Sequence, residues 1–288
     1  METQKTKTET KAETKAETES FFKSLSAEEK SPATIAKYRR DIAEFRHYLG
    51  GSDLCKEAVL RYRDELCARY RVSSVNSILS SLNRYFAFTG RHECRVKTLK
   101  MQKNLFASKE KELSPTEYEK LLSAAKGRGD VRLYYLMQTI CATGIRVSEL
   151  CFVTLEAVSA GFADIACKGK RRRIFLPGAL CRALSKYARK KKIQSGAIFI
   201  TRSGKPLDRS NIWSAMKKLC RAAGVAEEKV FPHNLRHLFA RTHYSRYKDI
   251  VRLADLLGHS SINTTRLYTM ENGDVHRRQI EMLGLLRC

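Results

Sequence analysis

The residues best suited to chemistry are two imidazoles, a guanidinium and a phenol near the C-terminal end of the sequence. They belong to His233, Arg236, His259 and Tyr268. His233 and Arg236 stand three residues apart after a proline, so a helix that begins there places both on one face. The same stretch holds no Asp/Glu pair and no Cys/His set spaced for a metal. This combination indicates phosphate chemistry without a metal ion.

Phosphate chemistry without a metal requires other cations. When an oxygen nucleophile attacks a phosphodiester, negative charge develops on the equatorial oxygens and has to be neutralised. Arginine suits this task because it stays protonated and its planar fork matches two phosphate oxygens. The second candidate after Arg236 is Arg146 in CATGIRVSELC, at a turn that follows Gly144. Glu149 is placed either to orient the Arg146 guanidinium or to cap a helix.

A lysine comes from the segment ADIACKGKRRRIFLP, which predicts two short strands joined by a Lys168-Gly169 turn. A lysine at the tip of such a hairpin can reach into a cleft. If neighbouring cations lower its pKa, the ammonium can give a proton to a departing 5′ oxygen. Tyr268 would then be the nucleophile of a covalent phosphotyrosyl intermediate, and rejoining the strand would need no ATP. Lys168 and Lys170 are both candidates for the acid.

Two glycine-ended helices are expected to position these groups. An apolar helix over residues 131–143 ends at Gly144, and a short helix over residues 249–257 ends at Gly258. Glycine is the residue that most readily adopts the left-handed conformation that closes a helix. His259 should therefore lie exposed just beyond the second helix. Two further histidines, His237 and His243, have no spacing that demands more than a structural role.

Six residues and their neighbours carry a resemblance to a known family. They are Arg146 in ATGIRVSEL, Lys168 in CKGKRRR, His233 and Arg236 in HNLRHLFART, His259 in LGHSSINTT, and Tyr268 in RLYT. In order and in neighbours they resemble the tyrosine recombinases, which include the phage integrases and the Xer-like site-specific recombinases.

The resemblance implies a role for each of these residues. It implies that the two arginines and the two histidines bind and polarise the scissile phosphate, and that the tyrosine attacks it. His233 resembles the family's base or phosphate ligand, and His259 resembles its hydrogen-bond donor to a phosphate oxygen. The family's Lys-Gly register favours Lys168 over Lys170 as the general acid.

The composition indicates the class of binding partner and the cellular compartment. The chain has 288 residues and a formal net charge of +25, which calls for a polyanionic partner. Nucleic acid is the expected partner, because no segment reaches the roughly 18 apolar residues of a membrane span, and the resemblance implies double-stranded DNA. The N-terminus lacks the apolar core of a signal peptide. Nine cysteines without a C-x-x-C pair indicate free thiols in a reducing cytoplasm. No cofactor or metal is expected.

The sequence predicts a mainly α protein with two domains. Residues 1–20 repeat Lys, Thr, Ala and Glu, lack apolar side chains that could fold alone, and are expected to form a flexible leader. Residues 21–108 show helical periodicity and predict a small bundle, which the resemblance identifies as a SAM-like core-binding domain that contacts DNA. Residues 109–288 predict a mixed, mostly α catalytic domain with a small β-hairpin sheet. A basic segment over residues 91–111 is the expected hinge between the two.

Helices in the first domain are expected over residues 32–48, from a cap at Ser52 or Asp53 to about residue 71, and over residues 74–88. Their polar faces, and the basic segments of the second domain, offer candidate contacts to DNA phosphates, although an ordinary solvated surface has the same composition. The candidates are Lys37, Arg40, Arg84, Arg172, Arg202, Lys205 and Arg209.

The tail after Tyr268 contains a partly apolar helix that a small domain has little room to bury. The resemblance implies that this tail docks on a neighbouring protomer and that four protomers act on two DNAs. The predicted function is site-specific recombination without metal or ATP, in integration or excision of a mobile element, inversion, or dimer resolution. Two alternatives are a type IB topoisomerase-like DNA-relaxing enzyme and a non-catalytic DNA-binding protein.

Overall fold

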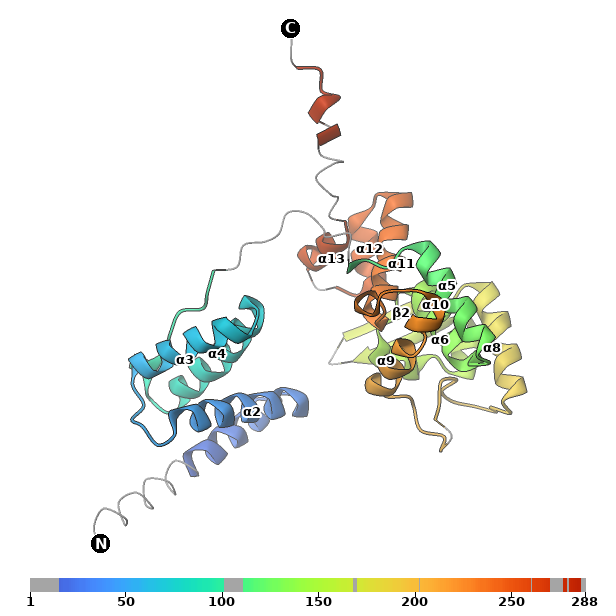
Figure 1. Cartoon of the computed structure of the whole chain (residues 1–288). Coiled ribbons are helices and arrows are strands. Elements are labelled where there is room, and N and C mark those ends of the chain that lie inside the picture. The colour runs from blue at the N-terminus through green and yellow to red at the C-terminus, as the bar shows by residue number, and fades with distance from the viewer. Residues whose placement is uncertain are drawn as a thin grey trace. The chain divides into compact units, whose positions relative to one another are not determined.

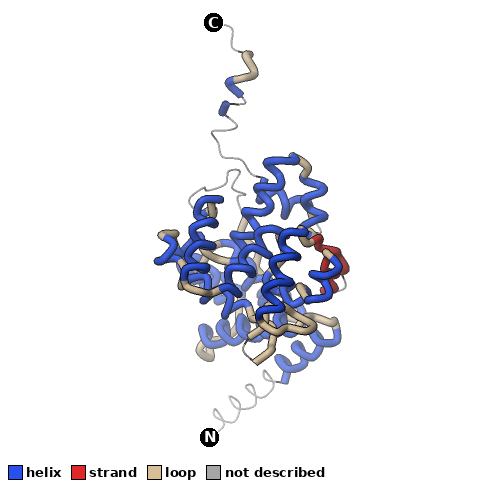
Figure 2. The backbone as a smooth tube through the Cα atoms, turned by 90° about the vertical axis from the view of Figure 1, so that its right-hand side faces the viewer, coloured by secondary structure: helices blue, strands red, loops and turns tan. Residues whose placement is uncertain are grey.

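The computed structural model describes residues 16–100, 111–167, 170–201, 203–259, 261–269, 277–278 and 280–285. The chain divides into two compact units, Met1–Lys103 and Asn104–Cys288 (Figure 1). Both units consist mainly of helices, and the sheet formed by the described residues is one antiparallel pair of strands (Figure 2). The predicted fold class, mainly α with a small β-hairpin, is confirmed.

The N-terminal unit is a bundle of helices around an aromatic core. A helix over residues 16–27 precedes α2 (Pro32–Leu49), α3 (Lys56–Arg69) and α4 (Val72–Phe88), and a short 3-10 turn follows (His92–Cys94). The α2 helix begins where the Ser31 hydroxyl accepts the Thr34 backbone N–H, and it ends at Gly50 with φ of 57°. The α3 helix begins later than predicted, because Cys55 and not Ser52 or Asp53 precedes it.

The predicted flexible leader, residues 1–20, includes five residues that are helical in the structure. Residues 16–20 already form the first turns of the opening helix, and Thr18 is buried with its hydroxyl 3.3 Å from that of Tyr85. Further along the same helix, Phe21 and Leu25 are 1% and 0% exposed in the core of the bundle. Burying these apolar side chains stabilises the helix, which extends back into the polar repeat. The first fifteen residues of the leader lie outside the described residues.

The C-terminal unit contains most of the elements. Their bounds are α5 Pro115–Gly127, α6 Val131–Thr143, η3 Val147–Phe152, α7 Leu155–Ala160, β1 Phe162–Cys167, β2 Lys170–Phe175, α8 Gly178–Lys190, α9 Arg209–Lys217, α10 Cys220–Ala223, η4 Glu227–Lys229, α11 Pro232–Tyr247, α12 Ile250–Leu257 and α13 Ile262–Thr269. The α5 helix begins with the predicted capping box between Ser114 and Glu117.

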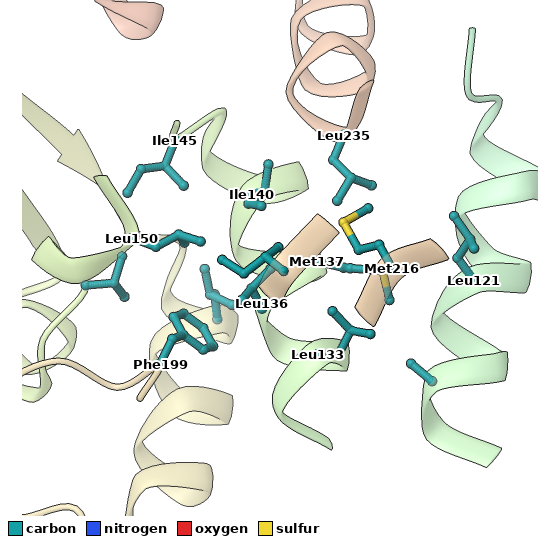
Figure 3. Close-up of a cluster of buried hydrophobic side chains, with 14 of the residues drawn as sticks. Leu121, Leu133, Leu136, Met137, Ile140, Ile145, Leu150, Phe199, Met216 and Leu235 are labelled. Atoms are coloured by element: carbon teal, nitrogen blue, oxygen red, sulfur yellow. The ribbon is translucent and has the colours of Figure 1, made fainter. Parts of the chain in front are cut away.

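Helix α6 lies at the centre of this unit. Its buried side chains Leu133, Leu136, Met137 and Ile140 meet side chains from α5, α9, α11 and the segments around the hairpin (Figure 3). Helix α11 packs along α6, and α12 and α13 pack against α11 (Figure 1). Because α6 leads directly to Arg146, and α11 to α13 carry the other candidates, this packing determines where the reactive side chains meet.

The hairpin directs one of its arginines inward. Antiparallel pairing sets Ile165 opposite Arg172 and Ala163 opposite Ile174. Residues directly opposite each other lie on one face of a sheet, and every second residue along a strand returns to that face. Ala163, Ile165 and Ile174 are buried, so Arg172 shares the buried face. Its side chain is only 14% exposed.

Candidate active site

Three of the side chains at the site come from the first two turns of α11. Proline at the start of this helix needs no backbone hydrogen bond, and the next residues are His233, Arg236 and His237. The spacing i, i+3, i+4 places them on one face. The ring centroids of His233 and His237 lie 4.7 Å apart, and that of His237 lies 4.5 Å from Tyr268. A row of rings therefore runs from α11 to α13.

Arg236 is the buried centre of the site, with 1% of the residue exposed. Its guanidinium donates to the carbonyl of Gly144, to that of Leu257 at 2.7 Å, and to His259 Nε2 at 3.0 Å. Burial lowers the pKa of Arg236 to about 10, Arg146 acts in the same direction, and a hydrogen bond and charge at Tyr268 oppose them. Arg236 therefore remains a cation at neutral pH.

Both glycines end their helices as predicted, and both have the left-handed conformation that was predicted for Gly258. Gly144 closes α6 with φ of 65°, and Gly258 closes α12 with φ of 62°. Each glycine is also required by its surroundings. A Cβ at Gly144 would lie 2.5 Å from Cδ1 of Phe239, and a Cβ at Gly258 would lie 2.4 Å from Cδ of Arg172. The glycines allow two arginine-bearing segments to approach closely.

Three consecutive carbonyl groups at the C-terminal end of α12 each accept a hydrogen bond from a different arginine. Arg172 donates to Leu256 at 2.6 Å, Arg236 to Leu257 at 2.7 Å, and Arg146 to Gly258 at 3.1 Å. The last carbonyl groups of a helix carry partial negative charge and lack partners within the helix. The end of α12 therefore stabilises three cations next to one another, which would otherwise repel.

Glu149 completes this arrangement and performs both roles that its position in the sequence allowed. Its carboxylate accepts the Arg146 backbone N–H at 3.0 Å, the Arg146 guanidinium at 2.9 Å, and the Arg172 guanidinium at 2.6 Å. Burial alone would raise the pKa of Glu149, but the backbone hydrogen bond and the two arginines hold it below its ordinary value. The ionised carboxylate orients both guanidiniums.

Tyr268 and His259 face each other between α12 and α13. Their rings are stacked with centroids 5.6 Å apart and planes 16° from parallel, and Tyr268 is 6% exposed. His259 Nδ1 lies 2.8 Å from the hydroxyl oxygen of Thr265. Burial lowers the pKa of His259 to about 4, and Arg236 and Arg146 add to this effect. The imidazole is therefore neutral at physiological pH.

The structure brings together five of the six predicted site residues: Arg146, His233, Arg236, His259 and Tyr268. Lys168 lies outside the described residues, as does the side chain of Lys170. Burial, followed by Arg236, Arg146 and Arg209, lowers the pKa of His233. Arg146 remains 37% exposed along its side chain, so this cation is open to a ligand.

The predicted DNA contacts have different surroundings. In the N-terminal unit, Lys37 binds Asp41 and Ser81, Arg84 pairs with Glu28, and the Arg40 side chain is 65% exposed. In the C-terminal unit Lys205 and Arg209 are exposed, and Arg202 lies outside the described residues. Arg172 lies beside the candidate site, where it donates to the carboxylate of Glu149 and to the carbonyl group of Leu256. Its predicted contact with DNA stays a prediction.

His237 is a site residue that the sequence reasoning treated as structural. It lies between His233 and Tyr268, and burial lowers its pKa to about 3. The signal was present in the sequence, because a residue four positions after His233 and next to Arg236 falls on the same helical face. Thr265 was missed as well, since its contact with His259 depends on how α13 returns to the end of α12.

Among the described residues, His, Cys, Asp and Glu side chains form no group of three that could hold a metal ion. The helices of the described part of the chain include none that is both long and apolar enough to cross a bilayer. Chemically, the site offers two guanidiniums, neutral imidazoles and a buried phenol within one network. These groups suit an anionic, tetrahedral group such as a phosphodiester.

Comparisons with known proteins identify the family of this chain. The family model described as Phage integrase family matches residues 111–274, and the Phage integrase, N-terminal SAM-like domain matches residues 18–93. The tyrosine recombinase XerA of Pyrococcus furiosus is 31% identical over 278 residues, which cover 93% of this chain and 94% of that protein. The tyrosine recombinase XerC of Roseiflexus castenholzii is 30% identical over 283 residues, 88% of each protein.

Solved structures share the fold. A lambda integrase (75-356) dimer bound to a COC′ core site has a TM-score of 0.72 and 20% identity, covering 90% of this chain and 95% of that one. The XerH site-specific recombinase bound to difH in a pre-cleavage complex has a TM-score of 0.67 and 19% identity, covering 86% and 79%. Since one family model spans more than half of the sequence and relatives match nearly its whole length, the chain belongs to the phage integrase family, the tyrosine recombinases.

Proposed function

We propose that this chain is a site-specific DNA recombinase that cleaves and rejoins DNA through a 3′-phosphotyrosyl intermediate at Tyr268. The observation that carries the proposal is the meeting of a buried phenol with His259 and two arginines around the end of α12. A phenol in such surroundings is a nucleophile placed beside cations that can neutralise a phosphate.

In the proposed reaction the Tyr268 oxygen forms a bond to phosphorus, and the bond from phosphorus to the 5′ oxygen breaks. Arg146 and Arg236 bind the nonbridging oxygens, and His259 donates a hydrogen bond to one of them. His233 takes up the phenolic proton, and Lys168 gives a proton to the departing 5′ oxygen. The covalent bond retains the energy of the phosphodiester, so a 5′ hydroxyl from another strand can reverse the step without ATP or metal.

The proposed substrate is double-stranded DNA, and the proposed working assembly is a tetramer. A net charge of +25 favours a polyanion, and relatives of known structure include a lambda integrase tetramer bound to a Holliday junction. We propose that residues 21–108 form the core-binding domain and residues 109–288 the catalytic domain. The described part of the tail exposes Ile280, Leu283 and Leu285 by 68%, 62% and 83%, which suits docking on a second protomer.

A nicked suicide substrate tests the chemistry. Cleavage near the nick releases a short fragment that carries the 5′ hydroxyl, and its loss prevents rejoining and leaves the enzyme attached to DNA. Wild-type protein should form this adduct in the presence of a chelator. Tyr268→Phe should bind the DNA and form none, and Tyr247→Phe, at a residue 58% exposed on the same unit, should retain the adduct. An adduct with Tyr268→Phe, or none with the wild type, would contradict the proposal. Relaxation of supercoils without recombinants between paired sites would instead favour a topoisomerase.

A further inference from the structure

The two ring nitrogens of His259 have partners that define where its proton resides. Nε2 lies 3.0 Å from Nη2 of Arg236, and Nδ1 lies 2.8 Å from the hydroxyl oxygen of Thr265. A guanidinium can only donate hydrogen bonds. Nε2 of His259 must therefore be the acceptor and carry no hydrogen, so the proton resides on Nδ1 and the Thr265 hydroxyl accepts it.

The charged surroundings agree with a single ring proton. Arg236 on α11, Arg146 before η3 and Arg172 on β2 all contact the end of α12 beside His259, and His233 lies on the facing helix. The ring of Tyr268 covers one side of the imidazole. With burial these cations lower the pKa of His259 to about 4. A second proton on the ring would face Arg236 directly.

This proton position is the opposite of the one that the proposed reaction needs. To donate a hydrogen bond to a phosphate oxygen next to Arg236, His259 must carry its proton on Nε2. The Nδ1 atom then becomes an acceptor and needs a donor as its partner. A threonine hydroxyl can accept or donate, whereas a carboxylate or a carbonyl group in its place could only accept. Thr265 therefore suits both forms of the ring.

We propose that Thr265 is a positioning residue that supports both tautomers of His259, the one that Arg236 selects in the free protein and the one that a bound phosphate requires. In the free protein its hydroxyl accepts from Nδ1–H and keeps Nε2 as an acceptor for Arg236. When a DNA phosphate takes the Arg236 hydrogen bond, one proton leaves Nδ1 to water and one joins Nε2, with no net change in charge. The Thr265 hydroxyl then donates to Nδ1, and Nε2–H donates to the phosphate. This inference rests on the proposed function.

The placement of Thr265 supports such a role. Thr265 is 0% exposed, and it precedes Tyr268 by three residues on α13, so both side chains face His259 from one helix. A buried hydroxyl without a partner is destabilising, so the hydrogen bond to His259 Nδ1 satisfies a group that would otherwise be unfavourable in this position. The neighbouring Thr264 is exposed and provides a matched control on the same helix.

The tautomer can be measured in the free, full-length protein by nitrogen NMR of labelled histidines, assigned with a His259→Gln variant. The expected result is a protonated Nδ1 and an unprotonated Nε2 at neutral pH. Thr265→Val removes the acceptor of Nδ1–H and should therefore weaken this preference, although Arg236 still donates to Nε2, whereas Thr265→Ser and Thr264→Val should keep it in full. A proton on Nε2 in the free wild type, or protons on both nitrogens, would overturn the proposal. The wild-type spectrum answers this even if Thr265→Val folds poorly.

Cleavage of the suicide substrate supplies the second readout. Thr265→Val should slow adduct formation by about 10-fold or more with unchanged DNA affinity, up to the roughly 100- to 1,000-fold loss seen when one oxyanion donor is removed. Thr265→Ser should recover most of the rate, and Thr264→Val should match the wild type. If wild type forms the adduct and Thr265→Val is equally fast, the tautomer proposal fails and the proposed function stands. If wild type forms no adduct, the proposed function fails, and with it the role assigned to Thr265.

Discussion

Glu149 shows how one buried carboxylate organises two cations. It is 4% exposed and binds the guanidiniums of Arg146 and Arg172 as well as a backbone N–H. Removing one partner of a buried ion pair leaves the other charges uncompensated. The arginines would then lose the group that fixes their direction, even though each keeps a carbonyl partner on α12.

We therefore expect Glu149→Gln to lower the free energy of unfolding by roughly 1–3 kcal/mol. Adduct formation should slow at least about 10-fold, since Arg146 is no longer oriented. The pKa of Glu149 is lowered in the folded state, so its contribution exists above the ordinary pKa of 4.5 and is lost as the pH falls further. Urea unfolding followed by the fluorescence of Trp213, the single tryptophan, reports the C-terminal unit alone. The exposed Glu119→Gln is the control, and an equal effect there would refute the role of Glu149.

The buried histidines predict a second pH dependence. Burial lowers the pKa of His237 from 6.5 to about 3 in the folded protein. The unfolded chain therefore binds more protons than the folded one between these values, so stability is full above pH 6.5 and falls as the solution becomes more acidic. His237→Phe keeps a ring against Tyr268 without this titration. It should reduce the loss of stability between pH 7 and pH 4.5 by about 2 kcal/mol.

Trp213 fluorescence in urea at the two pH values would measure this loss. His92→Phe, at an exposed histidine of the N-terminal unit, should leave the pH dependence of the C-terminal unit unchanged. A His237→Phe curve that falls with acid as steeply as the wild type would show that another group is responsible.

At the residue scale, the sequence identifies most of the side chains of the candidate site but not all of the contacts between them. Arg146, His233, Arg236, His259 and Tyr268 could be chosen because phosphate chemistry requires those types and the family order supports them. His237 was passed over, although helical spacing alone put it beside His233. Thr265 and Arg172 could not be found in this way, since their contacts join α13 and β2 to the end of α12 and depend on the fold.

At the scale of elements, the end of α12 positions the site. Its last carbonyl groups bind three arginines, and Gly258 then turns the chain so that His259 meets Arg236. The turn was predictable, because glycine after the last helical residue favours the left-handed cap. The close approach of β2 to the end of α12 was not predictable. It depends on the pairing of Ile165 with Arg172, which places this arginine on the buried face of the hairpin.

Two glycines of nearly equal φ separate the effect of conformation from that of contact. Gly258→Ala introduces a Cβ 2.4 Å from Arg172, whereas a Cβ at Gly224, with φ of 60°, has nothing within 4 Å. The left-handed conformation costs each alanine about 1–2 kcal/mol. Gly258→Ala should lower the free energy of unfolding by a further 1–3 kcal/mol or so and slow adduct formation, because Arg172 has to move. Equal losses of stability and activity in the two variants would show that the contact with Arg172 is unimportant.

At the scale of the whole molecule, composition and periodicity were enough for the mainly α fold, because helices with apolar faces and glycine ends recur along the chain. The boundary of the leader was not predictable, since the helix over residues 16–27 is stabilised by the burial of Phe21 and Leu25 among other helices. Local composition carries no information about that partner. Of the predicted hinge over residues 91–111, residues 101–110 lie outside the described residues, whereas Cys94 and Val96 are buried in the core of the N-terminal unit.

The tail predicts a separation of binding from assembly. Deleting residues 274–288 removes the exposed apolar side chains at 280, 282, 283 and 285 and leaves the network around Tyr268 in place. Binding to a single half-site should change less than about twofold, because exposed tail side chains contribute little to phosphate contacts. Recombination between two sites should fall at least about 10-fold if docking on a second protomer is worth 1.4 kcal/mol or so. Gel shifts measure binding to the half-site, and a two-plasmid assay measures recombination. Full recombination by the truncated protein would refute the docking role.

The most direct test of the account is to locate the bond between protein and DNA. After reaction with a nicked suicide substrate, digestion with nuclease and protease followed by mass spectrometry should find a nucleotide attached through its 3′ phosphate to the phenol oxygen of Tyr268. Attachment at another residue, or attachment through a 5′ phosphate, would contradict the assignment of Tyr268 as the nucleophile and of the surrounding arginines and histidines as its phosphate site.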